Sequence, residues 1–360
     1  MSSDCLKLTV YFGERTRAGD RFLADALIDV FARHELRTSV LLRGVHGFGA
    51  RHALRTDRLL SLSEDLPVAA VAVDARVRIE AALADVEALR FPGLVTLERA
   101  AMPAAAGGDG GKPVLDALHD ETKLTVYVGR HERSRGRPAA EAIVDVLHGA
   151  GVAGATVLLG VDGTAHGARR RASFVARNGE VPLMIISVGD GRRIAQALPD
   201  IASIAERPIL TLERVRVCRR DGVRLADPHD GPAADESGLG IWQKLMVYTG
   251  EAVLHDGRPL HRELVTALRR AGAAGATSLR GVWGFHGDHA PHGDKLWQLR
   301  RRAPIVTVVV DRPDRARAWF RIADELTATS GLVTSELVPA YRATTQDRTV
   351  GGLRPAQRIP

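Results

Sequence analysis

The sequence has few cysteines, no long apolar run and no leader-like N-terminus, and each absence excludes a class of protein. Cys5 and Cys218 are the only two cysteines in 360 residues, and they form no CxxC pair. Neither a disulfide framework nor a cysteine zinc site is therefore expected. No eighteen consecutive residues are apolar, so no membrane-spanning helix is expected. Residues 1–7 show no basic segment that leads into an apolar one, and we expect a cytoplasmic protein.

Lysines and aromatic residues are also scarce. Although the net charge is +7, only five of the fifty basic residues are lysines, and the arginines are scattered among 43 acidic residues. A nucleic-acid-binding protein would concentrate its basic residues in one stripe or patch. Aromatic residues make up 4% of the chain, which is few for a surface that stacks bases. No nucleic-acid partner is therefore expected.

The sequence contains three copies of one repeated unit. Three segments are nearly identical: Lys7-Leu-Thr-Val-Tyr-Phe-Gly13, Lys123-Leu-Thr-Val-Tyr-Val-Gly129 and Lys244-Leu-Met-Val-Tyr-Thr-Gly250. A glycine follows 33 residues after each of their tyrosines, at Gly44, Gly160 and Gly281. Each unit then closes on a similar segment that ends at Glu98, Glu213 or Glu336. This self-similarity predicts a repeat protein.

The boundaries of the units lie where the composition changes. We expect repeats at 1–100, 122–217 and 242–340, linkers at 101–121 and 218–241, and a flexible tail at 341–360. The first linker is rich in alanine and glycine, the second contains Pro228 and Pro232, and the tail is polar with Gly351 and Gly352. Such compositions are typical of linkers and chain ends.

Within each unit the hydrophobic period changes in a fixed order. Residues 6–12 alternate as a half-buried strand does, and Leu23, Ala26, Leu27 and Val30 have helical spacing. Strands are expected at 39–42, 68–73 and 94–97, with a second helix at 77–86. The order β-α-β-β-α-β predicts an α+β fold of the ferredoxin-like type, with two helices on one face of a four-stranded antiparallel sheet. Three such sheets around a pseudo-threefold axis would cover one another's open faces, so we expect a monomeric chain that forms an intrachain pseudo-trimer.

The motifs around the recurring glycine resemble a known family. Repeat 1 contains Arg43-Gly-Val-His-Gly-Phe-Gly49 and closes with Gly93-Leu-Val-Thr-Leu-Glu98, and repeat 3 contains Leu279-Arg-Gly-Val-Trp-Gly-Phe285. These segments resemble the domain of unknown function 190, which is related to the PII signalling proteins. The resemblance is weaker in repeat 2, where Leu159 and Thr164 replace the arginine and the phenylalanine. Family members are expected to form homotrimers, so three copies in one chain look like such a trimer with its subunits joined end to end.

The resemblance implies a regulatory or ligand-sensing protein and no enzyme. In PII relatives, small ligands such as adenine nucleotides occupy the clefts between subunits, and a long segment after the second strand, the T-loop, contacts a protein partner. The connection Leu89-Arg-Phe-Pro-Gly93 lacks the glycine-and-lysine phosphate loop of PII proteins, which argues against ATP binding by their route. No catalytic motif of the Walker, GxSxG or HExxH type is present, and no cofactor is expected.

The recurring glycines are the candidate ligand site. Glycines allow positive φ and close backbone approach, successive N–H groups can hold an anion, and arginine adds a forked donor. The candidate residues are Arg43, Gly44, Gly47, Phe48 and Gly49 in repeat 1, and Arg280, Gly281, Gly284 and Phe285 in repeat 3. The alternative is that the glycines only end a strand and turn the chain.

Two further groups of residues contain side chains that could carry chemistry. His286, His289 and His292 stand three residues apart with two aspartates nearby, and imidazoles with carboxylates suit zinc, nickel or copper. A solvated polar loop is the alternative. Glu98, Glu213 and Glu336 have no evident catalytic partner, so a cap or a surface ion pair is expected for them.

The sequence therefore predicts a PII-like protein that binds a small anionic effector in clefts between repeats and signals through T-loop-like segments. A metal-binding or scaffolding protein remains an alternative. An enzyme acting on a small phosphorylated or carboxylated compound is a further one.

Overall fold

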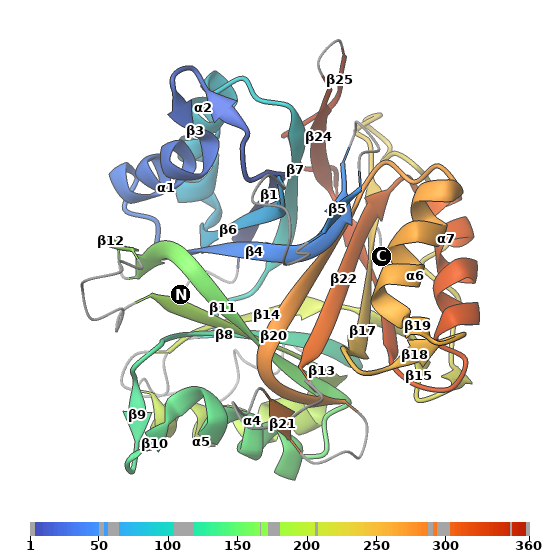
Figure 1. Ribbon diagram of the computed structural model, residues 1–360. Helices are drawn as coiled ribbons and strands as arrows, with labels where there is room; N and C mark the ends of the chain where they lie inside the picture. Colours follow the sequence, from blue (N-terminus) through green and yellow to red (C-terminus); the bar gives the residue numbers. More distant parts are fainter. Residues whose placement is uncertain are drawn as a thin grey trace.

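In the computed structural model, the structure describes residues 4–49, 54–56, 65–103, 119–165, 167–171, 181–205, 208–286, 291–293, 303–345 and 348–357. Over these residues the chain is of the α+β class, with a 19-stranded antiparallel sheet system and six helices (Figure 1). None of the described helices has the length and apolar character needed to cross a membrane. Cys5 and Cys218 are both buried, and neither forms a disulfide within the described residues.

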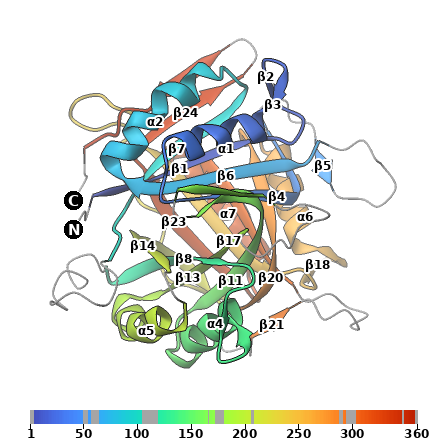
Figure 2. The same ribbon diagram turned by 90° about the vertical axis from the view of Figure 1, so that its left-hand side faces the viewer.

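Repeat 1 follows the element order predicted from the periodicity. Its main elements are β1 (Cys5–Gly13), α1 (Leu23–Arg33), β4 (Thr38–Phe48), β6 (Pro67–Ala75), α2 (Arg76–Ala88) and β7 (Gly93–Ala100), with the short strands β2 (Arg17–Ala18), β3 (Arg21–Phe22) and β5 (Arg55–Thr56). The sheet order is β7-β1-β6-β4, and all neighbours are antiparallel. Figure 2 shows α1 and α2 together on the outer side of this sheet.

Repeats 2 and 3 repeat this arrangement. Repeat 2 consists of β8 (Glu121–Gly129), β9 (Arg133–Ser134), β10 (Arg137–Pro138), α4 (Ala139–Gly149), β11 (Gly154–Ala165), β12 (Ala168–Arg171), β13 (Pro182–Asp190), α5 (Gly191–Ile204) and β14 (Ile209–Arg214). Repeat 3 consists of β17 (Trp242–Gly250), β18 (Leu254–His255), β19 (Arg258–Pro259), α6 (Leu260–Arg270), β20 (Ala276–His286), β21 (His292–Gly293), β22 (Pro304–Asp311), α7 (Pro313–Leu326) and β23 (Leu332–Val338). Their sheet orders, β14-β8-β13-β11 and β23-β17-β22-β20, match that of repeat 1.

Both faces of each sheet are buried, which explains the strong apolar character of the strands. One face packs on the helices of its own repeat, where Leu6, Leu8 and Val10 are fully covered. The other face turns to the middle of the molecule, where residues of all three repeats form one shared core that includes Val71, Met184 and Val308. Burial of apolar area on both faces is the main force that holds the repeats together.

Neighbouring repeats are also joined by exchange of strand pairing around the ring. The second half of β4 pairs with the first half of β20, the second half of β20 pairs with the first half of β11, and the second half of β11 pairs with the first half of β4. Each crossing has a register shift beside the recurring glycine. The three long second strands therefore close a cycle.

The segments between repeats close a second cycle, and here the structure corrects the expected flexible tail and second linker. β15 (Arg216–Arg220) lies in part of the linker 218–241 and adds to β23, with β16 (Val223–Arg224) as its hairpin partner. β24 (Ala340–Thr344) adds to β7 and forms a hairpin with β25 (Thr349–Gly352). Ala101 pairs with Leu212 of β14. The segment after each repeat covers the sheet edge of another, because an unpaired edge strand exposes backbone hydrogen-bonding groups.

Candidate functional site

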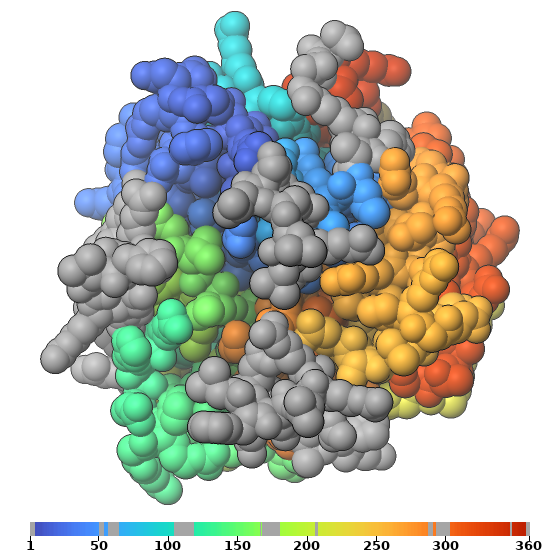
Figure 3. All heavy atoms as spheres, in the orientation of Figure 1, coloured from blue at the N-terminus to red at the C-terminus, as the bar shows by residue number. Residues whose placement is uncertain are grey.

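A cavity between repeats 1 and 3 has a volume of about 780 Å³. On this side of the molecule the blue surface of repeat 1 meets the orange surface of repeat 3 (Figure 3). One wall comes from β1, the turn after it and the end of β4, and the opposite wall comes from β22 and the turn between α6 and β20. The size is that of a typical small-molecule site, which is most often a concave pocket of 300–1,000 Å³.

The rim of this cavity is positively charged. Arg15 and Arg17 reach it from the hairpin after β1, and Arg315 reaches it from α7. Within the described residues, none of these three side chains forms an ion pair, whereas Arg55 is bound to Asp65 at 2.8 Å. Asp65 is the one acidic residue among the lining residues. The rim therefore carries an excess of guanidinium groups, which favours carboxylate or phosphate ligands.

The inner part of the cavity is apolar. Tyr11, Leu94, Val308 and Trp242 line it, and the Trp242 ring stacks on Tyr341 with 3.8 Å between ring centroids. Burial raises the pKa of the Tyr11 hydroxyl above its ordinary value. The Tyr11 phenol therefore stays neutral, and this wall adds no negative charge to oppose an anion.

The structure gives the recurring glycines a packing role. A Cβ on Gly47 would lie 2.4 Å from the carbonyl oxygen of Ala276, and one on Gly284 would lie 2.2 Å from that of Ala155. Gly44 and Gly281 are also crowded, by Pro67 and Pro304. The side-chain-free backbone lets β4, β11 and β20 cross closely, so these glycines lie within long strands instead of ending them, and a ligand role for them stays a prediction.

The predicted arginines lie outside the lining of the cavity. Arg43 binds Glu14 through two hydrogen bonds of 2.8 and 2.9 Å, and Arg280 binds Glu251 at 3.0 Å. Of the candidate ligand residues, Phe48 and Gly49 do line the cavity. Four arginines do so, Arg15, Arg17, Arg55 and Arg315, and they were missed because no motif marks them.

Phe48 and Phe285 connect neighbouring repeats. Phe48 is buried within the core of repeat 3, and Phe285 is buried within the core of repeat 2, where His148 meets its ring edge-on at 4.9 Å. In repeat 2 the equivalent residue is Thr164, which hydrogen-bonds Ser39 of repeat 1 at 2.9 Å. Each of these residues fixes one repeat to the next.

The proposed metal ligands are only partly described. His286 ends β20 and His292 begins β21, and their rings meet edge-on with centroids 6.2 Å apart. His289 lies outside the described residues. The metal site at His286, His289 and His292 therefore stays a prediction.

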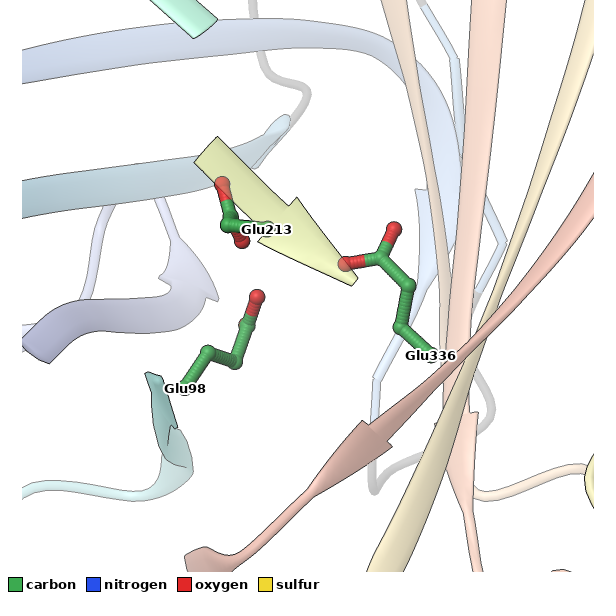
Figure 4. Close-up of side chains that lie close together, drawn as sticks. All are labelled: Glu98, Glu213 and Glu336. Carbon is green, nitrogen blue, oxygen red and sulfur yellow. The ribbon is translucent and has the colours of Figure 1, made fainter. Parts of the chain in front are cut away.

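The three recurring glutamates are buried at the centre of the molecule, which corrects the surface position expected from the sequence. Each comes from the last strand of its repeat, and together they face a common centre (Figure 4). Each pairs with the lysine directly opposite on the first strand, at 2.7 Å in repeat 1, 3.1 Å in repeat 2 and 3.0 Å in repeat 3. The six residues are Lys7, Lys123, Lys244, Glu98, Glu213 and Glu336, and their side chains are at most 4% exposed.

These six residues form a closed ring of alternating charge, here called the ion ring. Besides the glutamate of its own repeat, Lys7 binds Glu213. In the same way, Lys123 binds Glu336 and Lys244 binds Glu98. Every glutamate therefore accepts from two ammonium groups, and every lysine donates to two carboxylates. The carboxylates lie close enough together to suggest a metal site, but the lysines already supply the compensating positive charge.

Charge pairing outweighs desolvation at four members of the ion ring, Lys7, Lys244, Glu98 and Glu336, whereas burial lowers the pKa of Lys123 to about 8. Burial alone would raise the pKa of the Glu98 carboxyl, but the ammonium groups of Lys244 and Lys7 hold it well below its ordinary range. Burial alone would lower the pKa of Lys7, but Glu213 and Glu98 raise it well above its ordinary value. The available sequence signal was a lysine that directly precedes a leucine of the first apolar strand in every copy, as Lys7 precedes Leu8.

The fold and cleft define an α+β protein in which three copies of one βαββαβ unit close a ring. The chain belongs to the family DUF190, described as Uncharacterized ACR, COG1993, whose model matches residues 5–102, 121–217 and 242–340. The match confirms the resemblance and the three copies.

One curated protein matches part of this chain, and one solved structure aligns with nearly all of it. A "UPF0166 protein" of Aquifex aeolicus (strain VF5) is 28% identical over 93 residues, which are 26% of this chain and 86% of that protein. The crystal structure of an aspartate kinase from Synechocystis aligns with 97% of this chain and 45% of its own, at 12% identity and a TM-score of 0.25.

Proposed function

We propose that this protein is a PII-like pseudo-trimer of three ferredoxin-like repeats that senses a small anionic effector in the cleft between repeats 1 and 3. The identical sheet order of the repeats and their shared central core support the pseudo-trimer. In a ring of this kind, clefts between repeats are natural ligand sites, because each is concave and has walls from two units.

The observation that carries the proposal is the chemistry of the cleft. A cavity of about 780 Å³ has three arginines without an ion-pair partner among the described residues, Arg15, Arg17 and Arg315. Guanidinium groups at a half-enclosed rim bind carboxylate or phosphate strongly, because competing water is partly excluded. A binding role is favoured over an enzymatic one, because the one lining carboxylate, Asp65, is held by Arg55 instead of standing in an acid–base pair.

The position of the cleft also supports signalling. Phe48, Gly49 and Arg55 stand at the start of the T-loop-like segment between β4 and β6, and Asp65 and Pro67 stand at its end. A ligand in the cleft would contact both ends of this segment and shift its conformational populations. A protein partner that recognises one of those conformations would then bind or dissociate according to whether the cleft holds a ligand.

Ligand-induced change in melting temperature tests the proposal. A panel of adenine nucleotides, bicarbonate and small dicarboxylates should contain an anion that raises Tm by about 3 °C or more at saturating concentration. Replacing Arg15 and Arg17 by alanine should remove that rise. Arg21→Ala is the matched control, because Arg21 lies in the same hairpin but pairs with Asp29 of α1. A panel without any anion that raises Tm would contradict the proposed function.

A further inference from the structure

Two clefts of the ring are built from equivalent residues but differ greatly in size. The cavity between repeats 1 and 3 has a volume of about 780 Å³, whereas the one between repeats 3 and 2 has about 10 Å³. Four equivalent residues line both: Tyr11, Phe48, Pro67 and Leu94 in the first, and Tyr248, Phe285, Pro304 and Leu332 in the second. Since these residues correspond, the difference arises elsewhere in the two clefts.

One differing side chain stands at the end of the second strand. The residue after Phe48 is Gly49, whose Cβ position has no described heavy atom within 4 Å. The residue after Phe285 is His286, whose Nε2 lies 3.9 Å from the Cβ position of Gly250 and which lines the small cavity. The imidazole therefore lines the small cavity from a position at which repeat 1 has no side chain, although Arg55 and Asp65 lie beside Gly13, the equivalent of Gly250.

The charge of the two clefts differs at the hairpin after the first strand. Repeat 1 has Arg15, Thr16 and Arg17 there, and all three line the large cavity. Repeat 3 has Ala252, Val253 and Leu254 at the equivalent positions. The second cleft therefore lacks both the space and the two hairpin guanidinium groups of the first, although Arg193 stands at the position equivalent to Arg315.

The large cavity has one more wall. Ala343, Thr344 and Thr345, at and just after the end of β24, line it because β24 is added to β7. At each position of the ring the second strand of one repeat packs against a helix of its neighbour: β4 against α6, β20 against α4 and β11 against α1. The cleft between repeats 1 and 3 thus has a wall from the C-terminal segment, which adds to β7 as β15 adds to β23.

We infer that fusion of the three copies has specialised the clefts, so that one chain binds one ligand, between repeats 1 and 3. The inference rests on the proposed function and deepens it. The ligand is an organic anion: its charged end meets Arg15 and Arg17, and an apolar or aromatic body lies along Tyr11, Leu94 and Trp242. An inorganic anion would leave this apolar wall uncovered, without the gain that burial of apolar area provides.

The dye 8-anilinonaphthalene-1-sulfonate tests this inference, because it combines an anionic group with an aromatic body. Titration of the full chain, followed by dye fluorescence, should show one equivalent bound. Gly49→His, which copies the residue of repeat 3, should weaken binding at least tenfold. The pair Arg15→Ala and Arg17→Leu, which copies Ala252 and Leu254, should do the same without filling the cavity.

Gly149→His is the matched control, because its Cβ position is also open but lies at the end of α4, away from the cleft. Two or three equivalents of equal affinity, unchanged affinity in Gly49→His, or no dye binding at all would overturn the inference. If the dye binds as expected but no anion of the panel raises Tm, the proposed function is contradicted while the single binding cleft is still supported.

Discussion

The ammonium nitrogen of Lys123 lies 3.1 Å from a carboxylate oxygen of Glu213, the residue directly opposite on the neighbouring strand. The same ammonium group also binds Glu336 of repeat 3. The charge of one repeat is therefore balanced only when the next repeat is in place. Because each lysine has this double role, the ion ring is complete with three repeats and incomplete with two.

Removing one charge from the ion ring should destabilise the protein strongly. Lys123→Met leaves Glu213 and Glu336 with one lysine each in a buried site, and breaking a buried ion pair from one side costs about 3–5 kcal/mol. Urea denaturation at pH 7 would measure the free energy of unfolding. Arg21→Ala, which breaks an exposed pair with Asp29, should cost less than about 1 kcal/mol. Equal losses in the two variants would contradict the role of the ion ring.

The glycines of the shared motif should differ in their tolerance of a methyl group. Gly47→Ala places a Cβ 2.4 Å from the carbonyl oxygen of Ala276, so β4 and β20 must separate. We expect a loss of about 2 kcal/mol or more, as for other overpacked sites. Gly49→Ala, two residues later, meets no described atom within 4 Å and should be neutral within about 0.5 kcal/mol. Thermal melting of both variants checks this, and a tolerated Gly47→Ala would favour a ligand role over a packing role.

Acid should weaken the interface between repeats 1 and 3 through a buried histidine. Burial, with Arg262 and His46 nearby, lowers the pKa of His261 to about 4, from an ordinary value of about 6.5. Between these values the unfolded state binds the proton and the folded state does not, so the free energy of unfolding falls as the pH falls.

The contribution of His261 to this loss is about 3 kcal/mol between pH 6.5 and pH 4. His261→Ala should flatten the profile over this range, and alanine is also the equivalent residue in the other repeats, at Ala24 and Ala140. His229, whose pKa burial also lowers to about 4, should keep its own share of the slope. Urea denaturation at several pH values measures both, and an unchanged slope in His261→Ala would refute the assignment.

The sequence predicted the parts of the fold that depend on local pattern. The element order follows from hydrophobic alternation within one repeat, as at Leu6, Leu8 and Val10. The same order recurs in the other two copies, so no contact between repeats is needed to predict it. The partner of Lys7 could not be predicted, because Glu213 lies in another repeat and meets it only when the ring closes. The pairing of β24 with β7 was missed for the same reason.

The candidate site was predicted to be between repeats, but most of its residues were not. The motif pointed to Arg43, which binds Glu14, whereas the cavity is lined by Arg15 and Arg17 from a hairpin without any recognisable motif. Glycines that allow close strand crossing look the same in sequence as glycines that hold an anion. The two kinds of glycine are distinguished only in the structure, by the short distance from the Gly47 Cβ position to the backbone of the opposite strand.

Removing the C-terminal hairpin should impair both stability and the cleft. A chain that ends at Pro339 loses β24 and β25, which uncovers the edge of β7, and it loses the stacking of Tyr341 on Trp242. It also loses the wall formed by 343–345. We expect a fall in Tm of several degrees, since the stacked aromatic pair and the buried area around it are worth about 2–4 kcal/mol.

Anion binding should weaken more in this truncated chain than the fall in Tm explains. Dye binding at a temperature where the chain is still folded separates the two effects. A chain that lacks only residues 358–360 is the control and should match the full chain in both measurements. If the chain that ends at Pro339 melts and binds as the full chain does, then β24 is neither a structural edge cover nor part of the ligand site.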